Sequence, residues 1–257
     1  MTRFILTLIV SLLPFLAEGK SFYFRHYRND NGLSNNTVMA CIQDRRGFIW
    51  FGTKEGLNRF DGSRFRVFLH SPSDKNCIIN NFVTSLCEDS DGWIWVGTAK
   101  GICYYSPDND YFGSINEEII LTGDMIPDIK ADNNGYIWFI NSSGIFKYKK
   151  ENKKLIAYPA VEYFTPISIT VTHGSDIWFT ATNGKIYKYD PSNDDFVSYK
   201  ILNDKELTAS VRLVDILDDG NNGLIISTNL AGLRRLEPNT GNITTLFEND
   251  LLLNNIH

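Results

Sequence analysis

The chain has 257 residues, of which 43% are hydrophobic and 13% aromatic, so it can bury a sizeable core and is not a disordered protein. Its 25 lysine and arginine residues and 30 aspartate and glutamate residues give a formal net charge of −5, with no long block of either sign. This charge pattern argues against nucleic-acid binding and against attraction to an anionic membrane surface.

Residues 1–19 have the features of a secretory signal peptide. Arg3 gives the segment a basic start, and residues 4–16 form an apolar run that leads into the small-residue segment Ala17-Glu18-Gly19. The alternative is a membrane anchor, but the run is shorter than the roughly 20 residues that a spanning helix needs. We therefore predict that the chain is exported and that residues 20–257 form the mature part.

One motif recurs five times along the chain. Its first copy, Asp44–Gly62, combines an Asp-x-x-Gly turn, an apolar strand, a tight turn at Gly52–Gly56 and an alternating strand. A single hairpin cannot bury both of its faces, so the copies are expected to pack against one another. The equivalent central positions are Trp50, Trp95, Trp138, Trp178 and Ile225, which are 45, 43, 40 and 47 residues apart.

Each hairpin is flanked by one further strand on either side, and four short antiparallel strands in about 43 residues are typical of a β-propeller blade. The alternation and the glycine density exclude a helical repeat. We therefore predict an all-β fold, a β-propeller of four-stranded antiparallel blades, with five complete blades within residues 20–257. The predicted blades span residues 37–69, 82–116, 125–159, 167–201 and 210–248.

Two segments outside these blades indicate a ring that is cut short. Residues 22–27 resemble a lone outer strand, which in propellers commonly completes the last blade. The paired asparagines that precede the first and second blades recur at Asn254-Asn255, so residues 252–257 are interpreted as the start of a sixth blade. We expect the chain to be part of a longer protein with a seven-bladed ring.

The repeated tryptophans are expected to fill the wedge between neighbouring blades. A platform on which sugars stack is the alternative, but recurrence at one repeat position favours packing. Trp93 is assigned to the opposite face of its strand from Trp95, and so to another role. The structural repeat positions are Trp50, Trp95, Trp138, Trp178, Gly52 and Gly97.

The four cysteines admit disulfides in an exported chain, although small buried side chains with free thiols are the favoured interpretation. Cys41 and Cys87 are assigned to the same repeat position, with both side chains in the sheet packing. His173 is assigned to the position of the usual turn aspartate in the fourth repeat. Neither the cysteines nor the four histidines show the spacing of a metal site.

The repeats resemble the two-component regulator propeller family, whose blades follow a pattern close to Asp-x-x-Gly-x-hydrophobic-Trp-hydrophobic-Gly-Thr-x-x-Gly-Leu. Asp44–Gly62 matches this pattern almost throughout, Asp89–Tyr105 matches it well, and Tyr27–Val38 resembles the usual start of such sensors. The later blades depart from it: Ile140-Asn141 replaces Gly-Thr, Phe179-Thr180 follows Trp178, and Ile225 replaces the tryptophan.

The resemblance implies a periplasmic sensor that recognises an oligosaccharide and forms a homodimer when full-length. In this family, two seven-bladed propellers precede a small β-sandwich, a membrane helix, a histidine kinase, a receiver and a DNA-binding regulator. We expect the membrane and kinase parts downstream of His257. For this chain we expect no catalytic residue, cofactor, metal ion or nucleic acid.

Two alternatives stay open, a propeller enzyme that acts on polysaccharide as a glycosidase or lyase and a propeller that binds another protein. The sequence contains no Gly-x-Ser-x-Gly, P-loop or dinucleotide motif that would favour an enzyme. Ligand-binding residues are expected on the turns that join the second and third strands of each blade, because these turns share one face. The candidates are Lys54, Glu55, Lys100, Ser142, Asn183 and Asn229, with ordinary solvated turn composition as the alternative.

Overall fold

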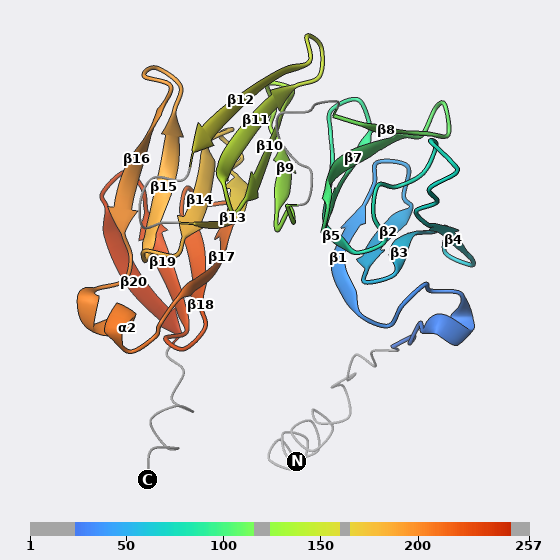
Figure 1. Ribbon diagram of the computed structural model, residues 1–257. Helices are drawn as coiled ribbons and strands as arrows, with labels where there is room; N and C mark the ends of the chain where they lie inside the picture. Colours follow the sequence, from blue (N-terminus) through green and yellow to red (C-terminus); the bar gives the residue numbers. More distant parts are fainter. Residues whose placement is uncertain (1–23, 116–123, 160–164, 248–257) are drawn as a thin grey trace, which may run out of the picture.

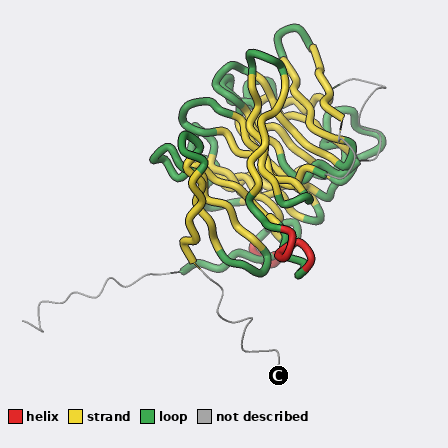
Figure 2. Tube along the Cα trace, turned by 90° about the vertical axis from the view of Figure 1, so that its left-hand side faces the viewer, coloured by secondary structure: helices red, strands yellow, loops and turns green. Residues whose placement is uncertain are grey.

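The computed structural model describes residues 24–115, 124–159 and 165–247 and contains five four-stranded antiparallel sheets (Figure 1). In every sheet the strands pair in chain order, so each sheet is a meander and forms one blade. The predicted all-β propeller fold is therefore confirmed. Strands make up nearly all of the regular structure, and the short helix α2, Asp204–Thr208, lies in the connection to the last blade (Figure 2).

The strand bounds of the five blades are as follows. Blade one contains β1 Val38–Gln43, β2 Ile49–Thr53, β3 Gly56–Phe60 and β4 Phe65–Phe68; blade two contains β5 Val83–Glu88, β6 Ile94–Thr98, β7 Gly101–Ser106 and β8 Tyr111–Ser114. Blade three contains β9 Ile129–Ala131, β10 Tyr136–Asn141, β11 Gly144–Lys149 and β12 Lys154–Pro159; blade four contains β13 Pro166–Val171, β14 Ile177–Ala181, β15 Lys185–Asp190 and β16 Asp195–Lys200. Blade five contains β17 Leu213–Asp218, β18 Leu224–Thr228, β19 Leu233–Glu237 and β20 Asn242–Phe247.

Neighbouring blades contact each other mainly through their first strands. β1 contacts β5, β5 contacts β9, β9 contacts β13, and β13 contacts β17, so these strands line the inside of an arc of sheets in chain order (Figure 1). The four strands have the same order in every blade. All turns between second and third strands therefore lie on one face of the arc, and all turns between first and second strands lie on the other.

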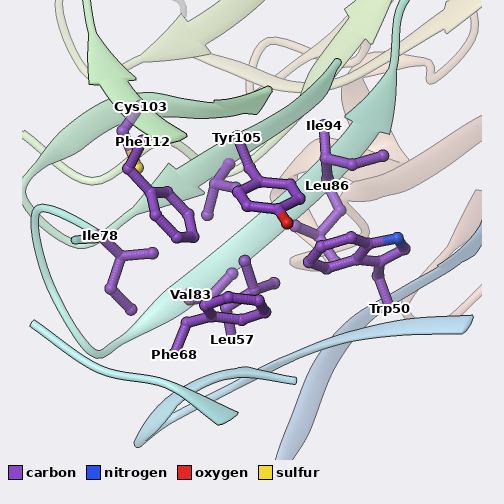
Figure 3. Close-up of a cluster of buried hydrophobic side chains, with 11 residues drawn as sticks. Trp50, Leu57, Phe68, Ile78, Val83, Leu86, Ile94, Cys103, Tyr105 and Phe112 are labelled. Carbon is purple, nitrogen blue, oxygen red and sulfur yellow. The ribbon is translucent and has the colours of Figure 1, made fainter. Parts of the chain in front are cut away.

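The core is divided into clusters between adjacent blades. Between blades one and two, Trp50 and Phe68 of blade one stack with ring centroids 5.8 Å apart (Figure 3). The Tyr105 ring of blade two packs against Trp50 with a centroid distance of 5.3 Å. Trp50, Trp95, Trp138 and Trp178 are all 0–1% exposed, and each packs against side chains of the following blade. Burying an aromatic side chain of this size stabilises the fold by about 1.5–3 kcal/mol.

The two ends of the arc each present a sheet face that the described residues cover only partly. On blade one, Tyr27 packs on Phe60 and Phe65, with centroid distances of 4.9 and 5.7 Å. On blade five, Leu217 and Phe247 are 61% and 64% exposed. A face of this kind is suited to contact with a further blade.

Residues 24–27 form no strand with the five described blades, so the closure strand expected over residues 22–27 stays a prediction. A strand needs a hydrogen-bonded neighbour, and none of the five described sheets includes this segment. The described residues do not include residues 22 and 23, the signal peptide expected over residues 1–19 or the sixth-blade start expected over residues 252–257.

The assignment of Cys41 and Cys87 to one repeat position is also wrong. Cys41 pairs with Phe51, whereas Cys87 pairs with Trp95, so the two cysteines are one strand position apart. Successive strand residues point to opposite faces, and Cys41 is exposed while Cys87 is buried. All four cysteines are free thiols, and burial raises the pKa of Cys87 well above its ordinary value.

Gly52 allows Val83 in the first strand of blade two to approach closely, and Gly97 does the same for Ser85 of its own blade and for Ile126, which precedes the first strand of blade three. A Cβ atom at position 97 would lie 2.1 Å from Ser85 Oγ and 3.0 Å from Ile126 Cγ2, and one at position 52 would lie 2.6 Å from Val83 Cγ1. Ser85 cannot move freely, because its hydroxyl donates to the carbonyl oxygen of Ile126 at 2.9 Å. These glycines therefore set the spacing between the first three blades.

Gly97→Ala is expected to lower the free energy of unfolding by about 1–3 kcal/mol, because the added methyl group overpacks the contact with Ser85 and Ile126. Chemical denaturation followed by tryptophan fluorescence measures this change. The double variant Ser85→Ala/Gly97→Ala should recover part of the loss, because the nearest clashing atom is removed. An unchanged stability of Gly97→Ala would show that the blades can separate without cost.

Candidate functional site

In blades one, two and five, a threonine hydroxyl braces the turn between the second and third strands. Thr53 Oγ1 donates to the carbonyl oxygen of Gly56 at 3.0 Å and accepts from the backbone N–H of Glu55 at 3.1 Å. Thr98 repeats both bonds in blade two, and Thr228 does so in blade five with shifted partners. The brace fixes the backbone of each turn, so that the next two side chains project from one face.

The six predicted ligand-binding residues fall into two groups. Lys54, Glu55, Lys100 and Ser142 are exposed, and their side chains make no hydrogen bond or ion pair with another described residue. Asn183, by contrast, donates to the Tyr187 hydroxyl at 2.8 Å, and Asn229 accepts from the backbone N–H of Arg212 at 2.7 Å. The first four are available to a ligand, while Asn183 stabilises its own blade and Asn229 binds the segment that leads into β17.

On the opposite face, the turns between first and second strands carry a buried aspartate brace. In blade one, Asp44 accepts the N–H groups of Arg46 and Phe48 through Oδ1 at 2.9 and 3.0 Å, and the Trp50 indole N–H through Oδ2 at 2.7 Å. Asp89 with Trp95 and Asp132 with Trp138 repeat this arrangement, with indole bonds of 2.9 Å. Each carboxylate thus ties its turn to the tryptophan that fills the blade interface.

Blade four lacks this carboxylate. The position six residues before Trp178 is Thr172, whose hydroxyl accepts the N–H of Asp176 at 3.1 Å. The sequence-based assignment of His173 to this position is therefore wrong by one residue. His173 is instead directed to blade five, where its backbone N–H and its Nδ1 lie 2.7 and 2.6 Å from Asp218 Oδ2.

A cavity of about 230 Å³ lies between these turns of blades four and five. Thr172, Gly174 and Trp178 from blade four line it together with residues of blade five. The Trp178 side chain is 0% exposed. Its Nε1 is buried as well and has no hydrogen-bond partner among the described residues. Such unpaired buried donors are costly and rare.

Charged groups around this cavity are paired. Lys188 Nζ lies 2.7 Å from Asp176 Oδ2 and 5.6 Å above the Trp178 ring. Burial acts to raise the pKa of Asp218, but hydrogen bonds from His173 and from the N–H of Gly220 hold it below its ordinary value. The wall of the cavity therefore carries one lysine–aspartate ion pair, one histidine–aspartate contact and free polar groups.

In blade five the turn aspartate keeps its backbone partners but has a different side-chain partner. Asp219 accepts the N–H groups of Asn221 and Gly223 at 2.7 and 2.8 Å, as in the first three blades. Ile225 takes the place of the tryptophan, and Arg235 Nε donates to Asp219 Oδ2 at 2.6 Å in place of an indole. The turn is kept, while its contact with the sheet becomes an ion pair.

Trp93 shares a face with Trp95, contrary to its sequence-based assignment. Both rings pack on Tyr104, with centroid distances of 4.6 and 5.2 Å, because residues two apart on a strand point the same way. Lys150 of blade three lies over the Trp93 ring at 4.1 Å and forms an ion pair with Asp89 at 2.9 Å. Trp93 thus completes the interface between blades two and three.

The described residues contain no group of three or more histidine, cysteine, aspartate and glutamate side chains placed to hold a metal ion. No helix in the described ranges is long and apolar enough to cross a membrane.

Comparison with known families identifies the repeats. Residues 32–55 and 77–100, which cover the entries to blades one and two, their first two strands and the turn that follows, match the family described as two component regulator propeller. A 62-residue stretch is 37% identical to histidine kinase P4 of Formosa agariphila, covering 24% of this chain and 4% of that protein. The first two repeats therefore match two-component regulator propeller repeats, as their sequence predicted.

Solved structures confirm the fold. Two extracellular domains assigned to hybrid two-component systems of B. thetaiotaomicron superpose with TM-scores of 0.64 and 0.59 at 18% and 20% identity. The matches cover 77% and 88% of this chain but 27% and 37% of those chains. Virginiamycin B lyase from Staphylococcus aureus superposes with a TM-score of 0.67 at 17% identity, over 89% of this chain and 74% of that chain. This chain spans well under half the length of these two extracellular domains.

Asp132→Ala is expected to lower the free energy of unfolding by about 2–4 kcal/mol, because it leaves the Trp138 indole N–H and two backbone N–H groups without an acceptor. Thr172→Ala is the matched control in blade four and should cost about 1 kcal/mol or less, because one backbone bond is lost. Urea denaturation of both variants measures the difference. Equal losses would show that the carboxylate–indole bond adds nothing to the turn.

Asp218→Asn tests the contact between His173 and blade five. A carboxylate whose folded pKa is lowered stabilises the fold above its unfolded pKa of about 3.9, and this contribution is lost as the pH falls through the folded value. The stability difference between the wild type and the variant should therefore be constant near neutral pH and shrink below about pH 4. Denaturation curves measured from pH 3 to pH 7 check this, and a constant difference would contradict it.

Proposed function

We propose that this chain is a ligand-sensing part of the periplasmic input region of a hybrid two-component sensor, and that its ligand is an oligosaccharide. The observation that carries the proposal is the match of residues 32–55 and 77–100 to regulator propeller repeats. The extracellular domains of hybrid two-component systems that share the fold support the same role.

The proposed binding surface is the face that carries the turns between second and third strands. Lys54 and Glu55 of blade one, Lys100 of blade two and Ser142 of blade three project there without partners among the described residues. Ammonium, carboxylate and hydroxyl groups suit the hydroxyl groups of a sugar, which both donate and accept hydrogen bonds. Threonine braces hold Lys54, Glu55 and Lys100 on rigid turns, which reduces the entropy lost on binding, and the Asn141 side chain closes the turn of Ser142 in the same way.

Signalling in this proposal requires a second copy of the sensor and the membrane and kinase parts of a longer protein. A ligand shifts the relative placement of two protomers only if it binds one arrangement more tightly than the other. The blades of this chain then contribute recognition, and catalysis resides in the kinase part.

Binding of a panel of oligosaccharides by isothermal titration calorimetry tests the proposal. The variant Lys54→Ala/Lys100→Ala should weaken the binding of a responding glycan by about tenfold or more, since two charge-assisted hydrogen bonds are lost. Arg64→Ala, an exposed change on the turn between β3 and β4 at the opposite face, serves as the control and should leave affinity unchanged. Absence of binding across the panel, or equal weakening by both variants, would overturn the proposed ligand class or the proposed face.

A further inference from the structure

The buried aspartate brace defines a complete set of donors for one carboxylate. In each of the first three blades the same three groups converge: an indole N–H and the backbone N–H groups two and four residues after the aspartate. In blade three, Asn134 and Tyr136 donate to Asp132 Oδ1 at 2.8 Å each, and Trp138 Nε1 donates to Oδ2 at 2.9 Å. The repeat therefore shows what a carboxylate needs at this position.

Blade four keeps the donors but has no carboxylate. Thr172 occupies the aspartate position and accepts only the N–H of Asp176, the group four residues on. Nε1 of Trp178 is buried and has no acceptor among the described residues. The N–H of Gly174, two residues on, has no protein acceptor among them either, and Gly174 is exposed at the mouth of the cavity. Both residues line the cavity between blades four and five.

The cavity can admit a small acid in place of the missing side chain. Its volume of about 230 Å³ exceeds the roughly 30 Å³ share of one water molecule. Lys188 lines it and occupies the strand position of Lys147, which lies 5.1 Å above the Trp138 ring of blade three. The two carboxylates in the wall, Asp176 and Asp218, are already paired with Lys188 and His173.

We propose that this cavity binds a small polar carboxylic acid. The ligand carboxylate takes the place of the missing aspartate and accepts hydrogen bonds from Trp178 Nε1 and Gly174 N–H. The side chains of Asn222 and Asn239, which also line the cavity, face the remainder of the ligand and suit a hydroxyl group on it. The site lies on the opposite face from the proposed oligosaccharide surface and does not depend on it.

A carboxylate fits these observations better than a neutral ligand. The two free donors belong to a set that holds an ionised carboxylate in three sister repeats, and hydrogen bonds to a charged acceptor are about twice as strong as neutral ones. Acetate and glycolate are suitable probes, since both present one carboxylate and glycolate adds a hydroxyl group. Acetamide has nearly the same shape without the charge.

Nuclear magnetic resonance of the whole chain tests the proposal directly, because each of its five tryptophans gives one indole N–H signal. Trp178→Phe assigns the signal of Trp178. Titration with sodium acetate or sodium glycolate should shift that signal alone and to saturation, with a dissociation constant on the order of millimolar. Acetamide and sodium chloride at equal concentration should cause no saturable shift.

Thr172→Asp is the decisive variant, because it supplies the carboxylate from the chain itself. It should raise the thermal midpoint, move the Trp178 signal toward those of Trp50, Trp95 and Trp138, and weaken the response to acetate by about tenfold or more. A Trp178 signal that acetate leaves unchanged would show that the cavity holds only water and would overturn the proposal. An equal response in wild type and Thr172→Asp would also overturn it, by placing the acid elsewhere.

Discussion

In the first three blades the structure depends on a hydrogen bond that pairs the buried indole N–H of a tryptophan. A tryptophan is large enough to fill the wedge between two blades, but its N–H group is taken out of water with the ring and needs an acceptor there. Asp44, Asp89 and Asp132 supply that acceptor and use their second oxygen to close the turn. Turn, strand and blade interface are thereby joined by one side chain, and this explains why the two residue types recur together six positions apart.

Blades four and five depart from this arrangement, each in a different way. Blade five replaces the tryptophan and retains the turn through Asp219 and Arg235. Blade four retains the tryptophan and loses the acceptor, which leaves Trp178 Nε1 unpaired beside a cavity. In blade five no buried indole N–H is present, so no acceptor is needed. In blade four the indole N–H is present without its carboxylate acceptor, and this leaves an unpaired donor beside a cavity.

Much of the fold could be predicted from the sequence because the repeat is local. The spacing of Trp50, Trp95, Trp138 and Trp178 and the strands around them depend on neighbours within one hairpin, and they indicate the five blades directly. The strand expected near residues 24–27 is different, because it would need a partner from a last blade that is not among the five described sheets. The register of Cys41 was misassigned by one residue, which in a strand exchanges the buried and exposed faces.

The candidate sites were less predictable, because they depend on contacts between distant residues. The sequence identified the turns of Lys54 and Lys100, but not that Asn229 is bound to Arg212 seventeen residues away. The cavity between blades four and five was missed because the fourth repeat was aligned on His173. Counting six residues back from Trp178, as from the other tryptophans, would have found Thr172 in the place of an aspartate. That absence in an otherwise regular repeat was the available signal.

The partly covered faces at the two ends of the arc have a consequence for the dynamics of the chain. A blade in the middle of the arc is held by two neighbours, whereas blade five, with Leu217 and Phe247 exposed, is held by one among the described residues. In stacked repeats the opening free energy of a unit is roughly the sum of its own stability and its neighbour contacts. Amide hydrogen exchange should thus be slowest in blades two to four and faster toward both ends, so that local opening begins at blades one and five.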